Sequence, residues 1–123
     1  MKGSESKKTG FERNLKLISQ SFKGGNSDLL SSGLEKKIEL IIDNDKIAFQ
    51  NLSVSQTKPI LSSFFKKNSP LSFNYIYQGA NRSALQYCIG NYKSKNSDYL
   101  VYVLIQKGKN DRFLVNTLQL KKE

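Results

Sequence analysis

The chain has 123 residues and a formal net charge of +10, from 20 Lys and Arg against 10 Asp and Glu. This length fits one domain with a hydrophobic core of its own. There is no histidine and a single cysteine, Cys88, so an intrachain disulfide is excluded, and the commonest general base and metal ligand is absent. The positive charge suits nucleic acid, anionic lipid or an acidic partner, but the basic residues are scattered singly and in pairs.

The hydropathy of the chain and its polar N-terminus indicate where the folded domain begins. No stretch approaches the roughly 20 apolar residues that a membrane-spanning helix requires. The opening MKGSESKKTG is polar and lacks the apolar segment of a signal peptide. We expect residues 1–8 to form a disordered lead and residues 9–123 to form a single domain.

Two helices are predicted in the first part of the domain. Thr9 and Glu12 have the spacing of a capping box, and an apolar stripe of helical period follows over residues 11–22. Gly24-Gly25 ends this helix, because glycine adopts the left-handed backbone at a helix C-terminus without steric cost. A short second helix is predicted after Asn26, which caps it.

A hairpin and a third helix follow. Apolar residues alternate with polar ones over residues 34–53, and Asn44-Asp45 offers a turn between two strands. Helical spacing then returns, with Ser55 or Thr57 as the capping residue. Pro59 would then lie in the first turn, where its missing N–H has the smallest cost.

Four further strands complete the chain, separated by turn-rich stretches. They are expected at residues 71–78, 83–93, 98–107 and 112–121. Consecutive strands joined by short turns favour an antiparallel sheet, with the helices packed on one face. The fold class is therefore α+β.

Five aromatic residues in residues 64–77 are the main candidates for a core or a site. Phe64 and Phe65 are about 100° apart on a helix, so one arc of the helix can bury both. Phe73, Tyr75 and Tyr77 alternate, so they are expected to share one face of their strand. Aromatic residues on such a face favour contact with the helices.

A series of short motifs resembles a bacterial domain of unknown function, the one numbered 4783. The motifs are GN at 25–26, IEL at 38–40, FFKKNSP at 64–70, SF at 72–73, QG at 78–79 and YCIGNY at 87–92. No single motif is specific, and their shared order over roughly residues 12–122 carries the resemblance. It implies the cone-shaped nuclear-transport-factor-2-like fold, also called ketosteroid-isomerase-like or cystatin-like. In this fold a curved antiparallel sheet of six or so strands has two or three N-terminal-half helices on its concave face.

The resemblance also implies a location, although the family has no assigned activity. Its members usually carry an export signal, so an extracytoplasmic protein of the periplasm or cell envelope is expected, with its leader absent from this sequence. Members often have His at the position of Tyr77 and Arg at that of Leu100. A polar site built on those groups would be lost or rebuilt in this chain.

A pocket enzyme of the isomerase or dehydratase type is one alternative for a fold of this kind. Such enzymes place Asp, His or Tyr in an apolar pocket. Here no acid–base pair is visible: Glu12 is explained as a capping residue and Glu39 as the solvent side of a strand. We assign no catalytic residue, and an enzyme is the less favoured reading. The residues expected to line a pocket, if one exists, are Tyr75, Tyr77, Tyr87, Phe64 and Phe65.

The favoured function is a non-catalytic binding or interaction module that takes a small ligand or an envelope protein. Strands 83–93 and 98–107 are apolar on both faces, and the second face could be covered by another subunit, giving a homodimer through the sheet. A basic nucleic-acid-binding domain is a further, less favoured alternative. Cys88 is expected to be buried and inert. No metal or cofactor is expected, because there is no histidine and no close carboxylate cluster.

Overall fold

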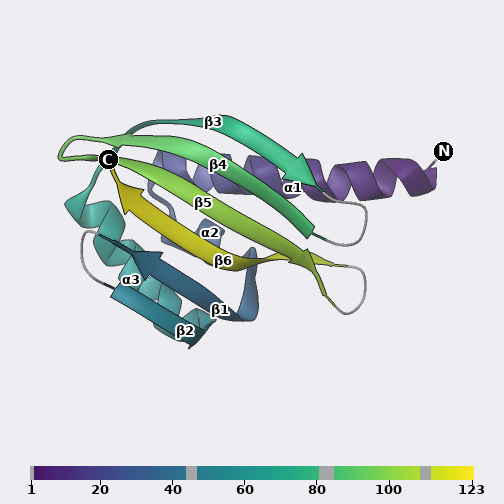
Figure 1. The fold of residues 1–123 in the computed structure, drawn as a ribbon, viewed down its shortest axis with the longest axis horizontal. Helices are drawn as coiled ribbons and strands as arrows, with labels where there is room; N and C mark the ends of the chain where they lie inside the picture. Colours follow the sequence, from purple (N-terminus) through teal and green to yellow (C-terminus); the bar gives the residue numbers. More distant parts are fainter. Residues whose placement is uncertain (1, 44–46, 81–84, 109–111) are drawn as a thin grey trace.

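The computed structural model describes residues 2–43, 47–80, 85–108 and 112–123, with side chains from residue 11 onward. Its elements are α1 (Lys2–Gly24), α2 (Ser27–Ser31), β1 (Leu34–Ile42), β2 (Ile47–Ser53), α3 (Val54–Lys67), β3 (Pro70–Ala80), β4 (Leu85–Ser94), β5 (Asp98–Lys107) and β6 (Phe113–Lys122) (Figure 1). The predicted α+β class and the order of helices and strands are confirmed. The predicted turn at Asn44-Asp45 lies outside the described residues.

Six strands form one sheet in the order β2-β1-β6-β5-β4-β3. All neighbouring pairs are antiparallel except β1 and β6, which run parallel, so the expectation of a wholly antiparallel sheet is wrong at that one pair. A short turn forces antiparallel pairing, whereas α3 and four strands separate β1 from β6 in the sequence. No local connection therefore constrains the relative direction of β1 and β6.

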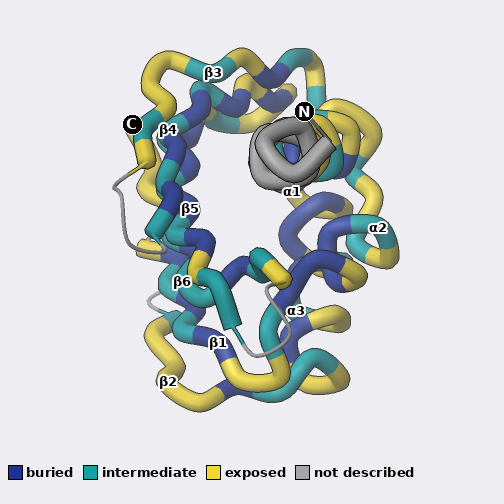
Figure 2. The backbone as a smooth tube through the Cα atoms, turned by 90° about the vertical axis from the view of Figure 1, so that its right-hand side faces the viewer, coloured by how far each residue is buried: buried dark blue, intermediate teal, exposed yellow. Residues whose placement is uncertain are grey.

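The helices all lie on one side of the curved sheet (Figure 2). Seen edge-on, the sheet bends so that β3 arches over α1 at one end, while β1 and β2 lie beside α3 at the other. The face toward the helices is called the inner face below, and the opposite face the outer face. Among the described helices and strands, none lies against the outer face.

The helix ends differ from the prediction at two places. Helix α1 begins at Lys2, so Thr9 and Glu12 lie within it and do not cap it. Its predicted end is confirmed, since Gly25 has a φ of +60°. Helix α3 is capped by Ser53, not by Ser55 or Thr57, because the Ser53 side chain accepts from the Gln56 N–H while Gln56 Oε1 accepts from the Ser53 N–H.

Pro59 is consequently the sixth residue of α3 and lies beyond the first turn. In the second helix, by contrast, the predicted cap is confirmed. Asn26 Oδ1 accepts a hydrogen bond from the Leu29 N–H at 3.0 Å. The cap of α3 lies at Ser53 because Ser53 and Gln56 satisfy each other's backbone groups. Neither Ser55 nor Thr57 can do this at its position.

A cluster of aromatic rings fills the space between the helices and the sheet. Its members come from α1, α3, β3, β4 and β5: Phe22, Phe64, Phe65, Phe73, Tyr92 and Tyr99. Phe22 stacks on Phe73 with ring centroids 5.2 Å apart and meets Tyr92 edge-on at 5.6 Å. All six rings are less than 10% exposed. The burial of each ring contributes roughly 1.5–3 kcal/mol, so this cluster is a main source of stability.

Candidate functional site

The five predicted pocket-lining residues do not gather in one place. Phe64 and Phe65 belong to the aromatic cluster, where their rings are 5.7 Å apart and contact Tyr92. They are core residues of the domain. Tyr75 lies on the inner face, while the Tyr77 and Tyr87 side chains lie on the outer face, as the pairing of β3 with β4 shows.

A register shift in β3 separates Tyr77 from its expected neighbours. Tyr75 is paired with Gly90, and Tyr77 with Ile89, so Ile76 is an extra residue in the ladder. One extra residue inverts the alternation of side chains beyond it. Phe73 and Tyr75 therefore face the helices, and the prediction that Tyr77 shares their face is wrong.

Tyr77 and Tyr87 form a stacked pair on the outer face. Their ring centroids are 5.5 Å apart with an interplanar angle of 30°, and their hydroxyl oxygens are 3.3 Å apart. This hydrogen bond raises the pKa of Tyr87 above its ordinary value. Gly79 makes room for the pair: a Cβ there would be 2.8 Å from Cζ of Tyr87.

Polar side chains on the inner face attach α1 to the sheet. The Tyr75 hydroxyl donates to the carbonyl of Leu15, and Asn14 Nδ2 donates to the carbonyl of Phe113 at 3.2 Å. Burial and the neighbouring Cys88 raise the pKa of Tyr75 above its ordinary value. Burial likewise raises the pKa of the Cys88 thiol to about 12. These groups therefore stay protonated at neutral pH, and the two hydrogen bonds fix the position of α1.

Sequence reasoning missed two buried polar residues on this side, Asn14 and Gln86. Both are less than 10% exposed, and Gln86 Oε1 has no hydrogen-bond partner within the described part of the chain. Asn14 lies on the inward side of α1 with Ile18, Ser21 and Phe22, which are also buried, and Gln86 lies on a strand of mixed pattern. Nothing in the local sequence distinguishes either residue from a solvent-exposed one.

The two acidic residues considered as catalytic candidates do not line a pocket on the inner face. Glu39 is paired with Thr117 on the outer face, and Glu12 is exposed on α1. Over residues 11–43, 47–80, 85–108 and 112–123, no three Cys, Asp or Glu side chains come together as metal ligands do. The inner face thus offers packing and tethering groups, with no acid–base pair among its described residues.

The centre of the outer face is apolar. The term outer patch is used here for six side chains from β3, β4 and β5: Tyr77, Tyr87, Ile89, Leu100, Tyr102 and Leu104. Ile89 is paired with Tyr102 and Tyr87 with Leu104, so the patch continues across neighbouring strands. Tyr77 is 49% exposed and the other five are partly exposed. Tyr77 and Leu100, the two positions where the resemblance implies His and Arg, both belong to this patch.

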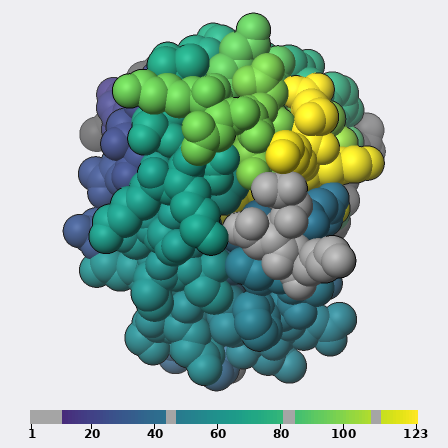
Figure 3. All heavy atoms as spheres, turned by 90° about the vertical axis from the view of Figure 1, so that its left-hand side faces the viewer, coloured from purple at the N-terminus to yellow at the C-terminus, as the bar shows by residue number. Residues whose placement is uncertain are grey.

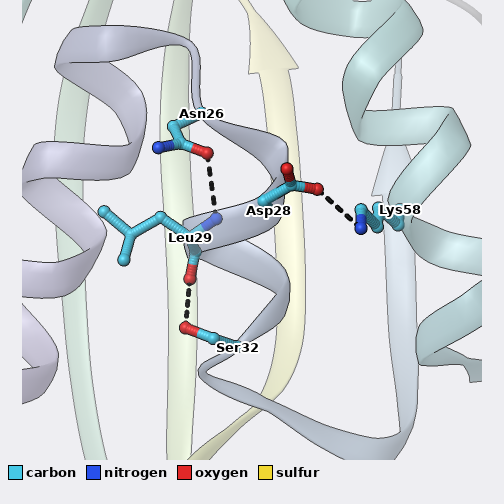
Figure 4. A network of polar contacts seen from close by, with 5 residues as sticks. All are labelled: Asn26, Asp28, Leu29, Ser32 and Lys58. Atoms are coloured by element: carbon cyan, nitrogen blue, oxygen red, sulfur yellow. Dashed lines mark hydrogen bonds and ion pairs between the residues drawn. The ribbon is translucent and has the colours of Figure 1, made fainter.

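An exposed ion pair joins the two shorter helices, beside hydrogen bonds within α2 (Figure 4). Lys58 Nζ of α3 is 2.6 Å from Asp28 Oδ1 of α2, and Ser32 Oγ donates to the carbonyl of Leu29. Both charged side chains are more than half exposed, so the ion pair contributes at most about 1 kcal/mol. We interpret this network as structural.

Comparisons with known proteins agree with the geometry. The family described as Domain of unknown function (DUF4783) matches residues 15–121. The chain belongs to this family. A crystal structure of a DUF4783 protein from Bacteroides uniformis ATCC 8492 shares 25% identity and a TM-score of 0.80, over 88% of this chain and 95% of that one. None of the curated proteins gives a significant sequence match.

More distant structures show which fold the DUF4783 domain has. An NTF-2-like protein of unknown function from Silicibacter pomeroyi has a TM-score of 0.69 at 5% identity, with 98% of each chain covered. A domain with a cystatin-like fold from Nostoc punctiforme has a TM-score of 0.68 at 11% identity, over 100% of this chain and 79% of that one. The predicted nuclear-transport-factor-2-like fold is confirmed. None of the helices in the described part of the DUF4783 domain has the length and hydropathy needed to cross a membrane.

Proposed function

We propose that this domain is a non-catalytic interaction module that works outside the cytoplasm and binds protein through the outer face of its sheet. The observation that carries the proposal is the outer patch, an apolar surface that no described element of the chain covers. Apolar groups gathered on one uncovered sheet face are typical of interaction surfaces.

The inner face supports the non-catalytic part of the proposal. Six aromatic rings pack against one another there, and the hydroxyl of Tyr75 already donates to a helix carbonyl. A small ligand would have to displace these contacts. Nucleic-acid binding draws less support. Single-strand binders combine exposed rings with basic side chains, whereas the rings of the outer patch have no charged side chain among them.

The first partner we propose for the outer face is a second copy of the chain. Four strands, β3–β6, of about ten residues give a surface of roughly 19 Å by 33 Å, or about 600 Å² on each copy. Stable interfaces bury roughly 1,200–2,000 Å² in total, and two such surfaces reach the lower end of this range. The outer face is therefore large enough for a homodimer.

The charges on this face also fit a symmetric pair. The outward charged residues of β3–β6 are Lys93, Asp98 and Lys121, and all three lie at the same end of the sheet. A twofold axis that lies in the interface and runs across the strands places this end of one copy over the opposite end of the other, where β3–β6 have no outward charged residue. Two highly basic copies can then meet without opposing their lysines.

The extracytoplasmic location rests on the resemblance to exported members of the family. It is tested by expressing the complete native gene in its host and separating the cell fractions. Recovery of the protein with periplasmic or envelope markers is expected. Recovery with cytoplasmic markers would contradict this part of the proposal.

The dimer is tested by sedimentation velocity over a range of protein concentrations. We expect a species of twice 14.0 kDa. Leu104→Lys places a charge in the centre of the outer patch and should weaken self-association by about tenfold or more. Ser63→Lys, on the exposed side of α3, is the matched control and should leave it unchanged.

Two results would overturn the dimer. One is a wild-type chain that sediments as a monomer at every concentration. The other is a folded Leu104→Lys variant that associates as the wild type does. Should Leu104→Lys fail to fold by circular dichroism, Leu100→Lys on the same strand takes its place, because Leu100 is also partly exposed.

A further inference from the structure

The two edge strands of the sheet lack charged residues. β2 and β3 together contain no Asp, Glu, Lys or Arg, whereas the four strands between them carry nine such residues. In the whole chain 24% of residues are charged. Proteins usually place charges, especially Lys, on edge strands to prevent other chains from pairing with them. This chain does the opposite.

The exposed apolar side chains concentrate on the same two strands. The large apolar residues that the structure describes as exposed are Leu71, Ile76 and Tyr77 on β3 and Phe49 on β2. Leu71 and Ile76 are 64% and 58% exposed, and each lies at a register shift where β3 has one residue more than β4. Neither contributes to the outer patch or to the core.

β3 is the better of the two edges for pairing with another chain. It spans 11 residues against 7 for β2. In β2, Asn51 has a φ of +57°, which breaks the extended backbone near the middle of that strand. β3 has no residue of positive φ, and on its far side from β4 no described strand is paired with it.

Lysines gather at the N-terminal end of β3. Lys66 and Lys67 end α3, Lys93 is paired across the ladder with Ser72, and the backbone N–H of Lys95 donates to the carbonyl of Ser69. All four lysines are exposed, and Asp98 is the acid paired across from Lys93. Figure 3 looks onto this end, where α3 and the start of β3 in teal adjoin the β4–β5 turn in green.

We propose that the free edge of β3 binds an extended segment of a partner protein as an added antiparallel strand, with acidic residues at the C-terminal end of that segment. An edge strand offers backbone N–H and C=O groups that such a strand can satisfy. Antiparallel addition brings the C-terminal end of the segment to the N-terminal end of β3, which is the lysine-rich end. Leu71 and Ile76 supply the apolar contacts along the edge.

The charge of the chain favours an acidic segment over a second copy at this edge. Each copy has a net charge of +10. If the β3 strands of two copies paired antiparallel, the lysine-rich end of one would lie at one end of the strand pair and that of the other at the opposite end, and β3 has no acidic residue to neutralise either. Acidic residues neutralise the lysine-rich end and accelerate association. This site goes beyond the outer-face dimer proposed above and uses different residues.

The test uses two defined peptides, TVTVTVEE and its matched control TVTVTVKK, with ¹⁵N-labelled protein. We expect TVTVTVEE to shift the amide signals of β3 in a saturable way and to slow their hydrogen exchange, and TVTVTVKK to bind about tenfold or more weakly at low salt. Ile76→Lys should reduce the affinity for TVTVTVEE by a similar factor. Phe49→Lys, which adds the same charge at the opposite edge, should leave it unchanged.

Several outcomes would overturn the β3 site. They are equal binding of the two peptides, no saturable binding at millimolar concentration, shifts that map to β2 or to the outer patch, and wild-type affinity in folded Ile76→Lys. A change in the sedimentation of Ile76→Lys without peptide would mean that the edge pairs copies of this chain. Leu71→Ser, which removes an apolar contact without adding charge at the lysine-rich end, serves if Ile76→Lys does not fold. The dimer is scored separately with Leu104→Lys, so either proposal can fail alone.

Discussion

Gly90 shows how a single missing side chain shapes the core. A Cβ at this position would be 2.2 Å from Cζ of Phe73, so the Phe73 ring lies directly across the Gly90 backbone. Phe73 in turn stacks on Phe22, which joins the sheet to α1. The glycine is therefore needed for close packing of a ring between β4 and the first helix.

We predict that Gly90→Ala destabilises the domain by about 1–3 kcal/mol, because the added methyl group forces the Phe73 ring out of its place. Urea denaturation followed by circular dichroism measures the change. Gly24→Ala is the matched control, since a Cβ at Gly24 would have no atom within 4 Å. Equal stability of Gly90→Ala and the wild type would show that the ring can move without cost.

Helix α3 depends on the reciprocal contact at its N-cap, Ser53. Ser53 Oγ is 3.2 Å from the Gln56 nitrogen, and Gln56 Oε1 is 3.0 Å from the Ser53 nitrogen. We predict that Ser53→Ala costs about 1 kcal/mol of unfolding free energy, whereas Ser63→Ala, on the exposed side of the same helix, costs little. Chemical denaturation of the two variants compares them. Equal losses would show that the cap contributes nothing specific.

The helices and strands could be predicted because their signals are local. The alternation of apolar residues, the glycines at 24–25 and the cap at Asn26 each act within a few residues of chain. The spacing of Ser53 and Gln56 was also present in the sequence, and a search for that pair would have placed the start of α3 correctly. The candidate site depended on how strands distant in the sequence pair with one another.

The side on which Tyr77 lies could not be predicted, because Phe73, Tyr75 and Tyr77 alternate without a break. The extra residue at Ile76 is a property of how β3 pairs with β4, and it leaves no mark in the pattern. The parallel pairing of β1 with β6 is equally non-local. Both features decide which residues reach the outer face, so the grouping of the tyrosines needed the structure.

The whole domain should lose stability in alkali. The unfolded Cys88 thiol loses its proton near pH 9, whereas burial raises the pKa of the folded thiol to about 12. Between these values the unfolded state binds fewer protons than the folded state, so the unfolding free energy falls as pH rises. From pH 7 to pH 10 we predict a loss of about 1 kcal/mol from this group.

Urea denaturation at the two pH values measures this loss, and Cys88→Ala provides the control. The difference between pH 7 and pH 10 should be smaller in Cys88→Ala. A remaining difference is expected from Tyr75 and Tyr92, because burial raises the pKa of both hydroxyls and acts in the same direction. An identical difference in wild type and variant would contradict the assignment to Cys88.

The position of β6 in the sheet has a consequence for biosynthesis. β6 lies between β1 and β5, so it joins the hairpin β1–β2 to the meander β3–β5. Until residues 113–122 have been synthesised, the central ladder cannot close, and Val115, Leu118 and Leu120 are missing from the core. A growing chain therefore stays open until nearly all of this sequence is made. Such a delay would matter if the proposed location outside the cytoplasm holds, because an exported chain crosses a secretion channel before it folds.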